Sequence, residues 1–322
     1  MLKRVAGTMF AVGLLLAANA QMAQPGARMA QPGAVNYVEG QVSLDGRNVA
    51  AEAVGSLQVS PGQTLETQSG KAEMLLTPGV FLRLSDQSAV RMVSPSITDT
   101  RVELLRGEAM VEAAQVEREN HLVVLDHGAS ALIGKRGIYE FRADVPAVMV
   151  FDGEAHVQQA DRTIDVGKGK ELLLGQNKPQ KFNHESAESG DPLYAWSKLR
   201  SEYVAEANMS TAQTFVVGAP GWYGTGWYWN PYFDSFAFLP GDGFFYSPFG
   251  WGWGFYSPAY FRAYAPYGYR GFVGRPGFAG RPGFVGRPGF VGRPGFTNAP
   301  RMSAPSFGGG HFGGGHFGGG RR

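Results

Sequence analysis

The sequence predicts an all-β domain of short antiparallel strands, arranged as a sandwich or a solenoid-like stack, followed by one amphipathic helix and a disordered low-complexity tail. Apolar and polar residues alternate in short runs between residues 36 and 174, which is the pattern of half-buried strands. Gly, Pro, Asn and Asp interrupt these runs about every ten residues, as turns do. A helical period begins only near residue 190, and Gly, Pro and aromatic residues dominate after residue 215.

The first 20 residues have the three parts of a bacterial secretion signal. Lys3 and Arg4 form a positive start, an uncharged apolar run follows, and Ala18-Asn19-Ala20 is a small-x-small cleavage site. The apolar run would form a helix of roughly 21 Å, shorter than the ~30 Å hydrocarbon core of a bilayer. We therefore expect cleavage after Ala20, no transmembrane anchor in the mature protein, and a location in the periplasm or at the cell surface.

The chain contains no cysteine. This composition excludes disulfides, thiol catalysis, zinc–thiolate sites and lipid attachment of the bacterial lipoprotein type. The folded part must therefore be held together by its core.

A Pro/Gly linker over residues 21–35 precedes the predicted β-domain, because residues 22–27 and 29–34 both read MAQPGA. The domain itself covers residues 36–180 and contains roughly a dozen strands of about five residues each. Its clearest hairpin joins residues 72–76 to residues 80–84 through the turn at Pro78-Gly79. About 140 residues suffice to bury a core that is stable by itself.

One amphipathic helix is predicted over residues 190–212. Asp191 has the chemistry of an N-cap, and Pro192 suits the first helical position. The apolar stripe expected to pack on the β-domain consists of Leu193, Trp196, Leu199, Tyr203 and Ala207. The side chains expected to face water are Lys198, Arg200, Glu202 and Glu206. Docking of this stripe on a partner is the alternative.

Residues 215–322 are predicted to form a disordered tail. Aromatic residues with irregular spacing fill residues 222–272, six-residue repeats of the type GFVGRP follow, and the chain ends in FGGGH-type units. Each repeat offers a ring and a cation or imidazole, which make weak contacts of ~0.5–1 kcal/mol but no packed core. Removing the tail is therefore expected to leave the melting of the β-domain nearly unchanged. The residues assigned to tail interactions are Arg275, Arg281, Arg287, Arg293, Phe278, Phe284 and Phe290.

Charge is divided unevenly along the chain. The formal net charge is +2, but nine arginines and no acidic residue follow Asp242, so residues 1–242 carry −7. This asymmetry suggests attraction between the two halves or a polyanionic partner such as an anionic surface polymer. Arginines that only keep an aromatic segment in solution are the alternative. No nucleic acid partner is expected for an exported chain, and the tail aromatics also suit self-association.

Candidates for catalysis and metal binding are weak. Residues 126–130 (DHGAS) contain the residue types of nucleophilic catalysis without a nucleophile elbow, and we expect a polar turn between two strands there. Five acids on a predicted strand pair and its turn are expected to be solvated: Glu103, Glu108, Glu112, Glu117 and Glu119. His311 and His316 on Gly spacers would make only a poor metal site. We therefore predict no enzyme, no cofactor and no metal site.

The strand region resembles the FecR domain family, named for a periplasmic ferric-citrate sensing protein. The segments that carry the resemblance are residues 61–67 (PGQTLET), 70–84 (GKAEMLLTPGVFLRL), 102–109 (VELLRGEA), 137–141 (GIYEF) and 148–157 (VMVFDGEAHV). Ile138 stands where the family usually has Thr. The resemblance covers about residues 36–176, and it implies a β-domain that binds another envelope protein or a surface polymer. Sensor members also carry a cytoplasmic segment that holds a sigma factor, which is not expected here.

Three functions follow from these observations. The first is a non-enzymatic exported cell-envelope protein whose FecR-like β-domain is a protein- or polymer-binding or scaffolding module, with a self-associating or adhesive tail. The alternative is a periplasmic signal-transduction component related to FecR-type sigma-factor regulation. The third is an envelope polysaccharide hydrolase, which would need a cleft holding two carboxylates.

Overall fold

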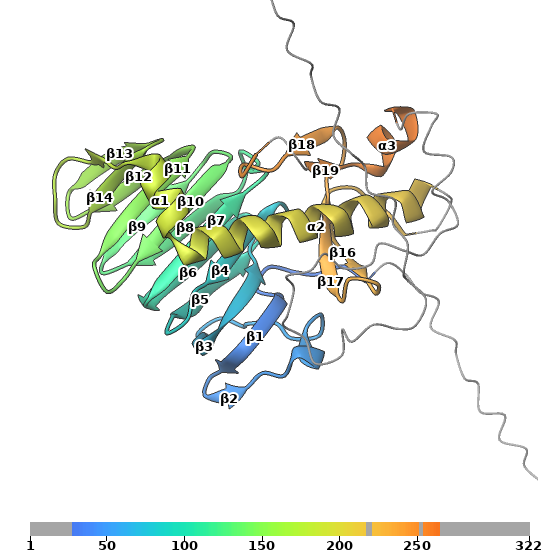
Figure 1. The fold of residues 1–322 in the computed structure, drawn as a ribbon, viewed down its shortest axis with the longest axis horizontal. Helices are drawn as coiled ribbons and strands as arrows, with labels where there is room; N and C mark the ends of the chain where they lie inside the picture. Colours follow the sequence, from blue (N-terminus) through green and yellow to red (C-terminus); the bar gives the residue numbers. More distant parts are fainter. Residues whose placement is uncertain (1–27, 217–220, 251–253, 265–322) are drawn as a thin grey trace, which may run out of the picture. The chain divides into compact units, whose positions relative to one another are not determined.

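The computed structural model describes residues 28–216, 221–250 and 254–264 (Figure 1). The signal segment with its site at Ala20, the Arg and Phe residues of the tail repeats, and the two tail histidines lie outside the described residues. None of the expectations that concern them is tested by the structure.

One continuous hydrogen-bonded sheet is folded over into two layers. Layer A contains β5 (Ala89–Ser96), β6 (Asp99–Arg106), β8 (His121–Asp126), β9 (Ala129–Ile133), β12 (Glu154–Gln159) and β13 (Arg162–Gly167). Layer B contains β4 (Val80–Leu84), β7 (Glu108–Ala113), β10 (Gly137–Arg142), β11 (Ala147–Asp152), β14 (Lys170–Leu173) and β15 (Gln180–Lys181). All pairings are antiparallel except that of β6 with β8. The prediction of an all-β domain is confirmed.

The long strand β3 (Thr64–Leu75) connects the layers. Its residues 64–66 pair with β5 of layer A, whereas its residues 72–75 pair with β4 of layer B. Strand β1 (Val35–Leu44) pairs along β3, and the two-residue strand β2 (Arg47–Asn48) pairs with β1. At the other end β13 contacts β11 and β14, which brings the layers together again. The hairpin predicted from residues 72–84 is the β3–β4 pair.

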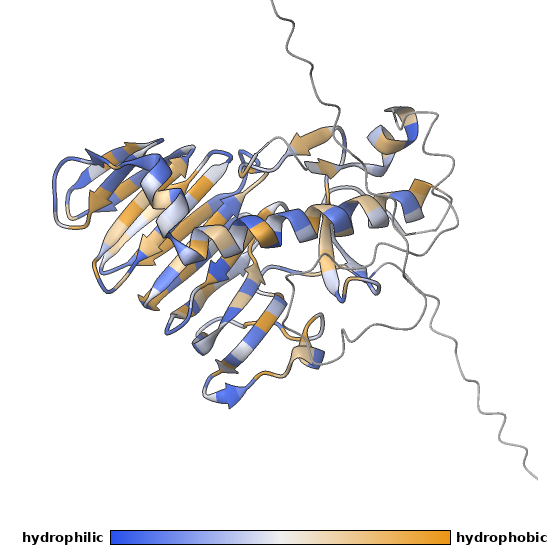
Figure 2. Cartoon of the chain, in the orientation of Figure 1, coloured by the Kyte–Doolittle hydropathy of each residue, from blue (hydrophilic) through white to orange (hydrophobic). Residues whose placement is uncertain are grey.

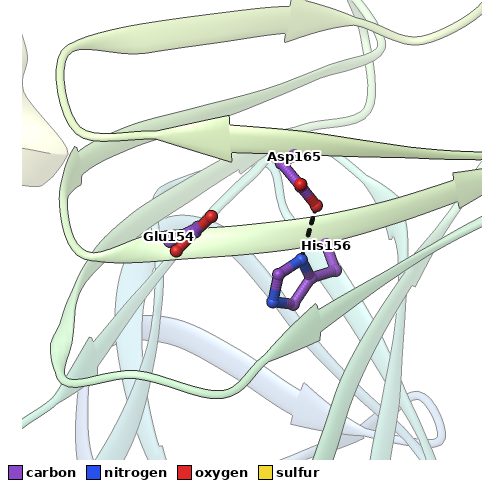
Figure 3. A group of neighbouring side chains, drawn as sticks. All are labelled: Glu154, His156 and Asp165. Atoms are coloured by element: carbon purple, nitrogen blue, oxygen red, sulfur yellow. Dashed lines mark hydrogen bonds and ion pairs between the residues drawn. The ribbon is translucent and has the colours of Figure 1, made fainter.

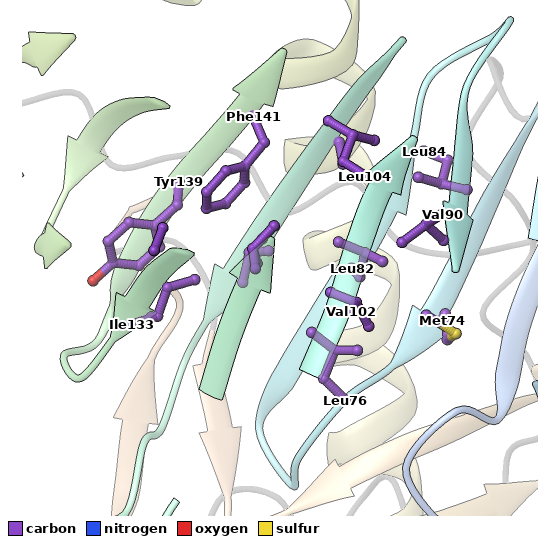
Figure 4. Packing of buried hydrophobic residues seen from close by; sticks show 14 of the residues in the cluster. Met74, Leu76, Leu82, Leu84, Val90, Val102, Leu104, Ile133, Tyr139 and Phe141 are labelled. Atoms are coloured by element: carbon purple, nitrogen blue, oxygen red, sulfur yellow. The ribbon is translucent and has the colours of Figure 1, made fainter. Parts of the chain in front are cut away.

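The main hydrophobic core lies between the two layers. Leu82 and Val111 enter it from layer B, and Val102, Leu104 and Val124 enter it from layer A; all five are buried. Figure 4 shows Leu82, Val102 and Leu104 in this core. The period-two alternation that predicted the strands also selects these residues, because every second side chain of a strand points to one face. Figure 2 shows this alternation of hydrophobic and hydrophilic residues along the strands.

The outer face of layer B is covered by a helix and by an aromatic segment. Helix α2 (Pro192–Val216) contacts β4 and β7, and the hairpin of β16 (Gly226–Asn230) and β17 (Ser235–Leu239) packs against α2 (Figure 1). Two further short strands, β18 (Phe244–Tyr246) and β19 (Gly254–Tyr256), and helix α3 (Pro258–Tyr264) follow. The prediction of disorder is therefore wrong for residues 221–250 and 254–264.

A tertiary contact explains why the aromatic segment folds. Trp227, Phe238 and Phe255 form a buried cluster with Leu75 and Phe81, which point outward from layer B. The rings of Phe81 and Trp227 meet edge to face, with their centroids 4.8 Å apart. Strands β16 and β17 are buried on both faces, so they lack the alternation that would have announced them.

The last part of the predicted linker also has a defined structure. The backbone N–H of Ala30 donates to the carbonyl of Trp227 at 3.1 Å, and the N–H of Trp229 donates to the carbonyl of Arg28 at 2.9 Å. Residues 28–30 therefore lie against β16 in the manner of a third strand. A Pro/Gly spacer became ordered because β16 presents an edge with unpaired backbone groups.

The face that α2 buries differs from the prediction. Leu199 is 41 % exposed, whereas Arg200, expected in water, is fully buried. The buried residues of α2 are Leu193, Tyr194, Ser197, Arg200, Ser201, Val204, Ala205, Ala207, Asn208, Thr211 and Ala212. A shorter helix, α1 (His184–Gly190), precedes α2 and was not predicted. Among the described residues, no helix has the length and apolarity needed to cross a bilayer.

Candidate binding cleft and the charged layer beneath helix α2

Four fully buried charged side chains lie between α2 and layer B. Nε of Arg83 lies 2.8 Å from Oε2 of Glu73, and its Nη1 lies 2.8 Å from Oε2 of Glu112. Nη2 of Arg200 on α2 lies 2.8 Å from Oε1 of Glu73. Two guanidinium groups thus balance two carboxylates, which is how proteins keep charge in an interior. The expectation that Glu112 would be solvated is wrong.

The electrostatics of this layer keep Glu73 ionised. Burial opposes the charged carboxylate, but the guanidinium groups of Arg200 and Arg83 outweigh burial and lower the pKa of Glu73 to about 2. The guanidinium of Arg200 also lies 4.4 Å from the ring centroid of Tyr37 on β1. These contacts bind α2 to the sheet at one defined position.

The charged layer also holds the aromatic segment. Asn36 donates from Nδ2 to Glu73 at 2.8 Å, and its Oδ1 accepts from the backbone N–H of Phe236 on β17 at 2.7 Å. The hydroxyl of Ser247 donates to Oε1 of Glu112 at 2.8 Å. These contacts join α2 and the aromatic segment to layer B, so the charged layer is a structural element that fixes α2 and residues 226–247 there.

A second buried carboxylate pair lies at the beginning of α2. Asp191 caps the helix by accepting from the N–H of Leu193 at 2.8 Å, which confirms the predicted N-cap. Glu140 on β10 is fully buried and accepts from Nε of Arg142 at 2.5 Å. Burial and the nearby Asp191 carboxylate, opposed by Arg142, raise the pKa of Glu140 to about 8. Near neutral pH, Glu140 therefore carries a proton.

A cleft with a volume of about 490 Å³ opens where α1, the first turn of α2, strands β10 and β11, and residues 244–250 meet. The polar side chains that line it include Arg136, Asp152, Lys168, His184, Glu188 and Tyr194. They come from the end of β11, the turns beside β10 and β14, and helices α1 and α2. Segments distant in the sequence therefore build this site together.

Charged groups in the cleft are paired with one another. Nζ of Lys168 lies 2.9 Å from Oδ1 of Asp152, and Nη1 of Arg136 lies 3.8 Å from Oδ2 of Asp152. Nη2 of Arg136 donates to the carbonyl of Tyr246 at 3.1 Å, which links the aromatic segment to the cleft. Asp152 therefore sits between two cations.

The opposite side of the cleft contains a tyrosine–glutamate–histidine chain. The hydroxyl of Tyr194 donates to Oε1 of Glu188, and this oxygen also lies 3.3 Å from Nδ1 of His184. Nε2 of His184 donates to the carbonyl of Phe151 at 2.9 Å. Burial and the Glu188 carboxylate raise the pKa of Tyr194 far above its usual value, so its hydroxyl stays a donor.

Aromatic rings form one wall of the cleft. The ring centroids of Phe151 and Tyr194 are 4.8 Å apart, and those of Tyr194 and Phe249 are 5.2 Å apart. An aromatic wall with a few fixed polar groups is typical of small-molecule and polymer binding sites. The cleft also holds two carboxylates, Asp152 and Glu188, which is the feature that the hydrolase hypothesis requires.

The candidate catalytic segment at residues 126–130 is a turn, as predicted. Asp126 pairs with Ala129 at the end of the β8–β9 hairpin, and His127 and Gly128 have φ values of 46° and 77° between them. Such a pair of left-handed residues makes a tight two-residue hairpin turn. Nδ1 of His127 lies 2.6 Å from Oδ1 of Asp126.

Sequence reasoning missed Arg200, His184 and Glu188. The sequence did contain a signal for the burial of Arg200. The β3–β4 hairpin places Glu73 and Arg83 on the same face as the apolar Leu75 and Phe81. Apolar and charged residues together on one outer face indicate a face that another element covers with matching polar groups. No comparable local signal existed for the cleft, which depends on the packing of α1.

Comparisons with known proteins give little beyond this geometry. No family model matches the chain, and no curated protein matches it. Two solved structures of a candidate anti-sigma factor from Parabacteroides distasonis, at 1.65 and 2.50 Å resolution, are similar to part of it. Their TM-scores are 0.34 and 0.33 at 15 % identity, over 42 % and 39 % of this chain and 64 % and 61 % of theirs. The chain thus spans less than two thirds of those structures, and such scores assign no function.

Proposed function

We propose that this chain is a non-enzymatic, exported cell-envelope protein whose β-domain binds a polymer or another envelope protein. The cleft carries the proposal, because it combines an aromatic wall with charged groups that already neutralise one another. The paired charged groups can form hydrogen bonds with a ligand, and the aromatic wall offers the ligand an apolar surface. Export rests on the secretion signal in the first 20 residues.

The ligand class that suits the cleft best is a polar chain with apolar faces, such as an envelope polysaccharide. The partly exposed rings of Phe244 and Tyr246 offer apolar surface at the cleft, while Lys168 and Arg136 offer donors for hydroxyl or acidic groups. Both cations are partly exposed at the rim of the cleft, 42 % for Arg136 and 66 % for Lys168.

The direct test is capture of polymers and proteins from envelope extract by the mature protein. The variant pair Arg136→Gln and Lys168→Gln, introduced together, removes the rim cations without touching the core. Arg101→Gln, on the outer face of layer A, is the matched control because its side chain is similarly exposed and also ion-paired. Polymer lost from the double variant but kept by the control supports the proposal. Equal capture by all three proteins refutes binding in the cleft.

A second function, hydrolysis of an envelope polysaccharide, is favoured by the presence of Asp152 and Glu188 in one cleft. Glycoside hydrolysis needs one protonated and one ionised carboxyl group at the scissile bond. Release of reducing ends from a captured polysaccharide, abolished in Asp152→Asn or Glu188→Gln, would replace the binding proposal by an enzymatic one.

The signal-transduction alternative rests on the resemblance of residues 36–176 to the FecR domain family. The capture experiment separates it from polymer binding, because a relay protein must bind a membrane partner. A retained outer-membrane receptor or membrane-bound sigma-factor regulator would favour this alternative, whereas a polysaccharide alone would exclude it as the main role.

A further inference from the structure

Three potential metal ligands lie together on the outer face of layer A. His156 on β12 and Asp165 on β13 are directly opposite each other in the strand register, and Glu154 precedes His156 by two residues (Figure 3). Residues two apart on a strand project from the same face, so all three side chains stand on one side of the sheet. Strand β13 is the last strand at this end of the sheet, and the side chains of His156 and Asp165 are both partly exposed to solvent.

The ligand atoms already lie within coordination reach of one another. Nδ1 of His156 is 2.6 Å from Oδ1 of Asp165, and one ligand atom from each of the three residues lies within 4.8 Å of the others. The side chains of Glu154, His156 and Asp165 are 28 %, 39 % and 65 % exposed. Because the backbone of both strands is held by the sheet, only side-chain rotation is needed to close the site.

We propose that Glu154, His156 and Asp165 form a binding site for a divalent transition-metal ion of the zinc type. One imidazole nitrogen and two carboxylate oxygens match the ligand preference of Zn²⁺, Co²⁺ or Ni²⁺, whereas Mg²⁺ and Ca²⁺ prefer oxygen alone. Three protein ligands leave at least one coordination position for water or for a group from a partner. This proposal replaces the expectation from the sequence that the protein has no metal site.

Comparison with the other histidines explains why this position is distinct. Nδ1 of His121 lies 3.0 Å from Oδ1 of Asp99 on the same outer face, in nearly the same pairing as His156 with Asp165. There, however, Nε of Arg101 donates to the same Asp99 oxygen at 2.8 Å, and no third His, Asp or Glu ligand atom of the described residues lies within the same reach. Within the described ranges, the Glu154 group is the one set of three such ligands that meets this distance.

Lys135 sets the affinity of the site. Its ammonium group forms an ion pair with Oε2 of Glu154, and a metal ion must displace or share that oxygen. Removing the lysine charge should therefore strengthen metal binding, while leaving the three ligands in place. Loss of binding in His156→Ala, which removes an imidazole and no negative charge, separates a metal site from a mere cluster of surface charges.

The experiment is titration of the mature full-length protein with Co²⁺, followed by visible absorption, and then competition with Zn²⁺. All variants carry His311→Ala and His316→Ala, so that the tail histidines contribute nothing. We expect one ion per chain, and a loss of affinity of at least about tenfold in His156→Ala and Asp165→Asn, since loss of even a supporting partner costs that much. Lys135→Gln should bind several-fold more tightly than the parent.

His121→Ala is the matched control and should bind Co²⁺ as the parent does. Thermal melts in the absence of metal check that each variant is folded, and added Zn²⁺ should raise the melting temperature of the parent but not of His156→Ala. Equal Co²⁺ affinity in His156→Ala and the parent, or no binding by the parent, overturns the proposal. Weaker binding in Lys135→Gln would also contradict it.

Discussion

The outer faces of the two layers use the same ion-pair chemistry in opposite environments. On layer A, pairs such as Arg91 with Glu103 are exposed to solvent, whereas on layer B the Arg83–Glu73 pair is fully buried beneath α2. Exposed pairs contribute about 0–1 kcal/mol to stability, while breaking a buried pair costs about 3–5 kcal/mol because a charge is left without its partner. The difference shows that the energetic contribution of a charged strand residue depends on whether another element, here α2, packs over its face of the sheet.

Substitutions on the inward faces of the two layers, where the layers are equivalent, should cause the largest loss of stability. Leu82→Asp in layer B and Leu104→Asp in layer A each place a charge without a partner in the core between the layers. Both variants should be unfolded by circular dichroism at 25 °C. A cooperative melt of either variant would show that the core does not lie between the layers at that position.

Removing the cover of layer B should cost nearly as much. A chain that ends after Val216 exposes Leu75 and Phe81 and loses the fully buried Trp227 and Phe238, each worth about 3–5 kcal/mol as a buried aromatic. We expect a loss of more than about 5 kcal/mol in urea unfolding, contrary to the expectation from the sequence. A chain ending after residue 264 keeps every described residue and serves as the control. Equal stability of the two shortened chains would mean that the aromatic segment is not part of the folded unit.

Single ion pairs compare the two outer faces directly. Arg200→Ala removes one guanidinium from the buried layer and should destabilise the protein by about 3–5 kcal/mol. Arg101→Ala, in an exposed pair on layer A, should change stability by less than about 1 kcal/mol. Equal unfolding midpoints of the two variants in a denaturant titration would remove the distinction between the faces.

The pH dependence of stability should report the pair at the beginning of α2. The pKa of Glu140 is about 8 in the folded protein, above its usual range, so the folded state keeps a proton that the unfolded chain releases. Below about pH 4.5 the carboxyl group is protonated in both states, and its contribution to the free energy of unfolding is fully present. That contribution is lost as the pH rises to about 8. Asp191 and Arg142 face the same carboxyl group, and both stay in place when only Glu140 is substituted.

Glu140→Gln keeps the shape of the side chain and cannot ionise. Relative to wild type, the variant should gain stability progressively between pH 4.5 and pH 8, by on the order of a few kcal/mol. The substitution leaves every other ionisable side chain in place, so the difference between the two proteins isolates Glu140. Glu103→Gln, on the outer face of layer A, should show no such trend. Parallel stability curves for Glu140→Gln and wild type would mean that Glu140 is ionised in the fold.

Local patterns in the sequence determined most of the secondary structure. The alternation on both sides of Pro78-Gly79 specified the β3–β4 hairpin, residues 126–130 specified a turn, and Asp191 specified the beginning of α2. Each of these depends on contacts within a few residues, where side-chain period and turn chemistry suffice.

Only the tertiary structure decided which faces are buried and where the sites lie. A hydrophobicity rule placed Arg200 in water, but the carboxylate of Glu73, distant in the sequence, makes burial of that face of α2 favourable. The aromatic residues within 226–250 and 254–255 fold because layer B presents an apolar patch to them. The cleft and the Glu154–His156–Asp165 group each need residues that the sheet brings together across turns or from other elements. Such pairings rest on long-range packing, which local period and composition do not encode.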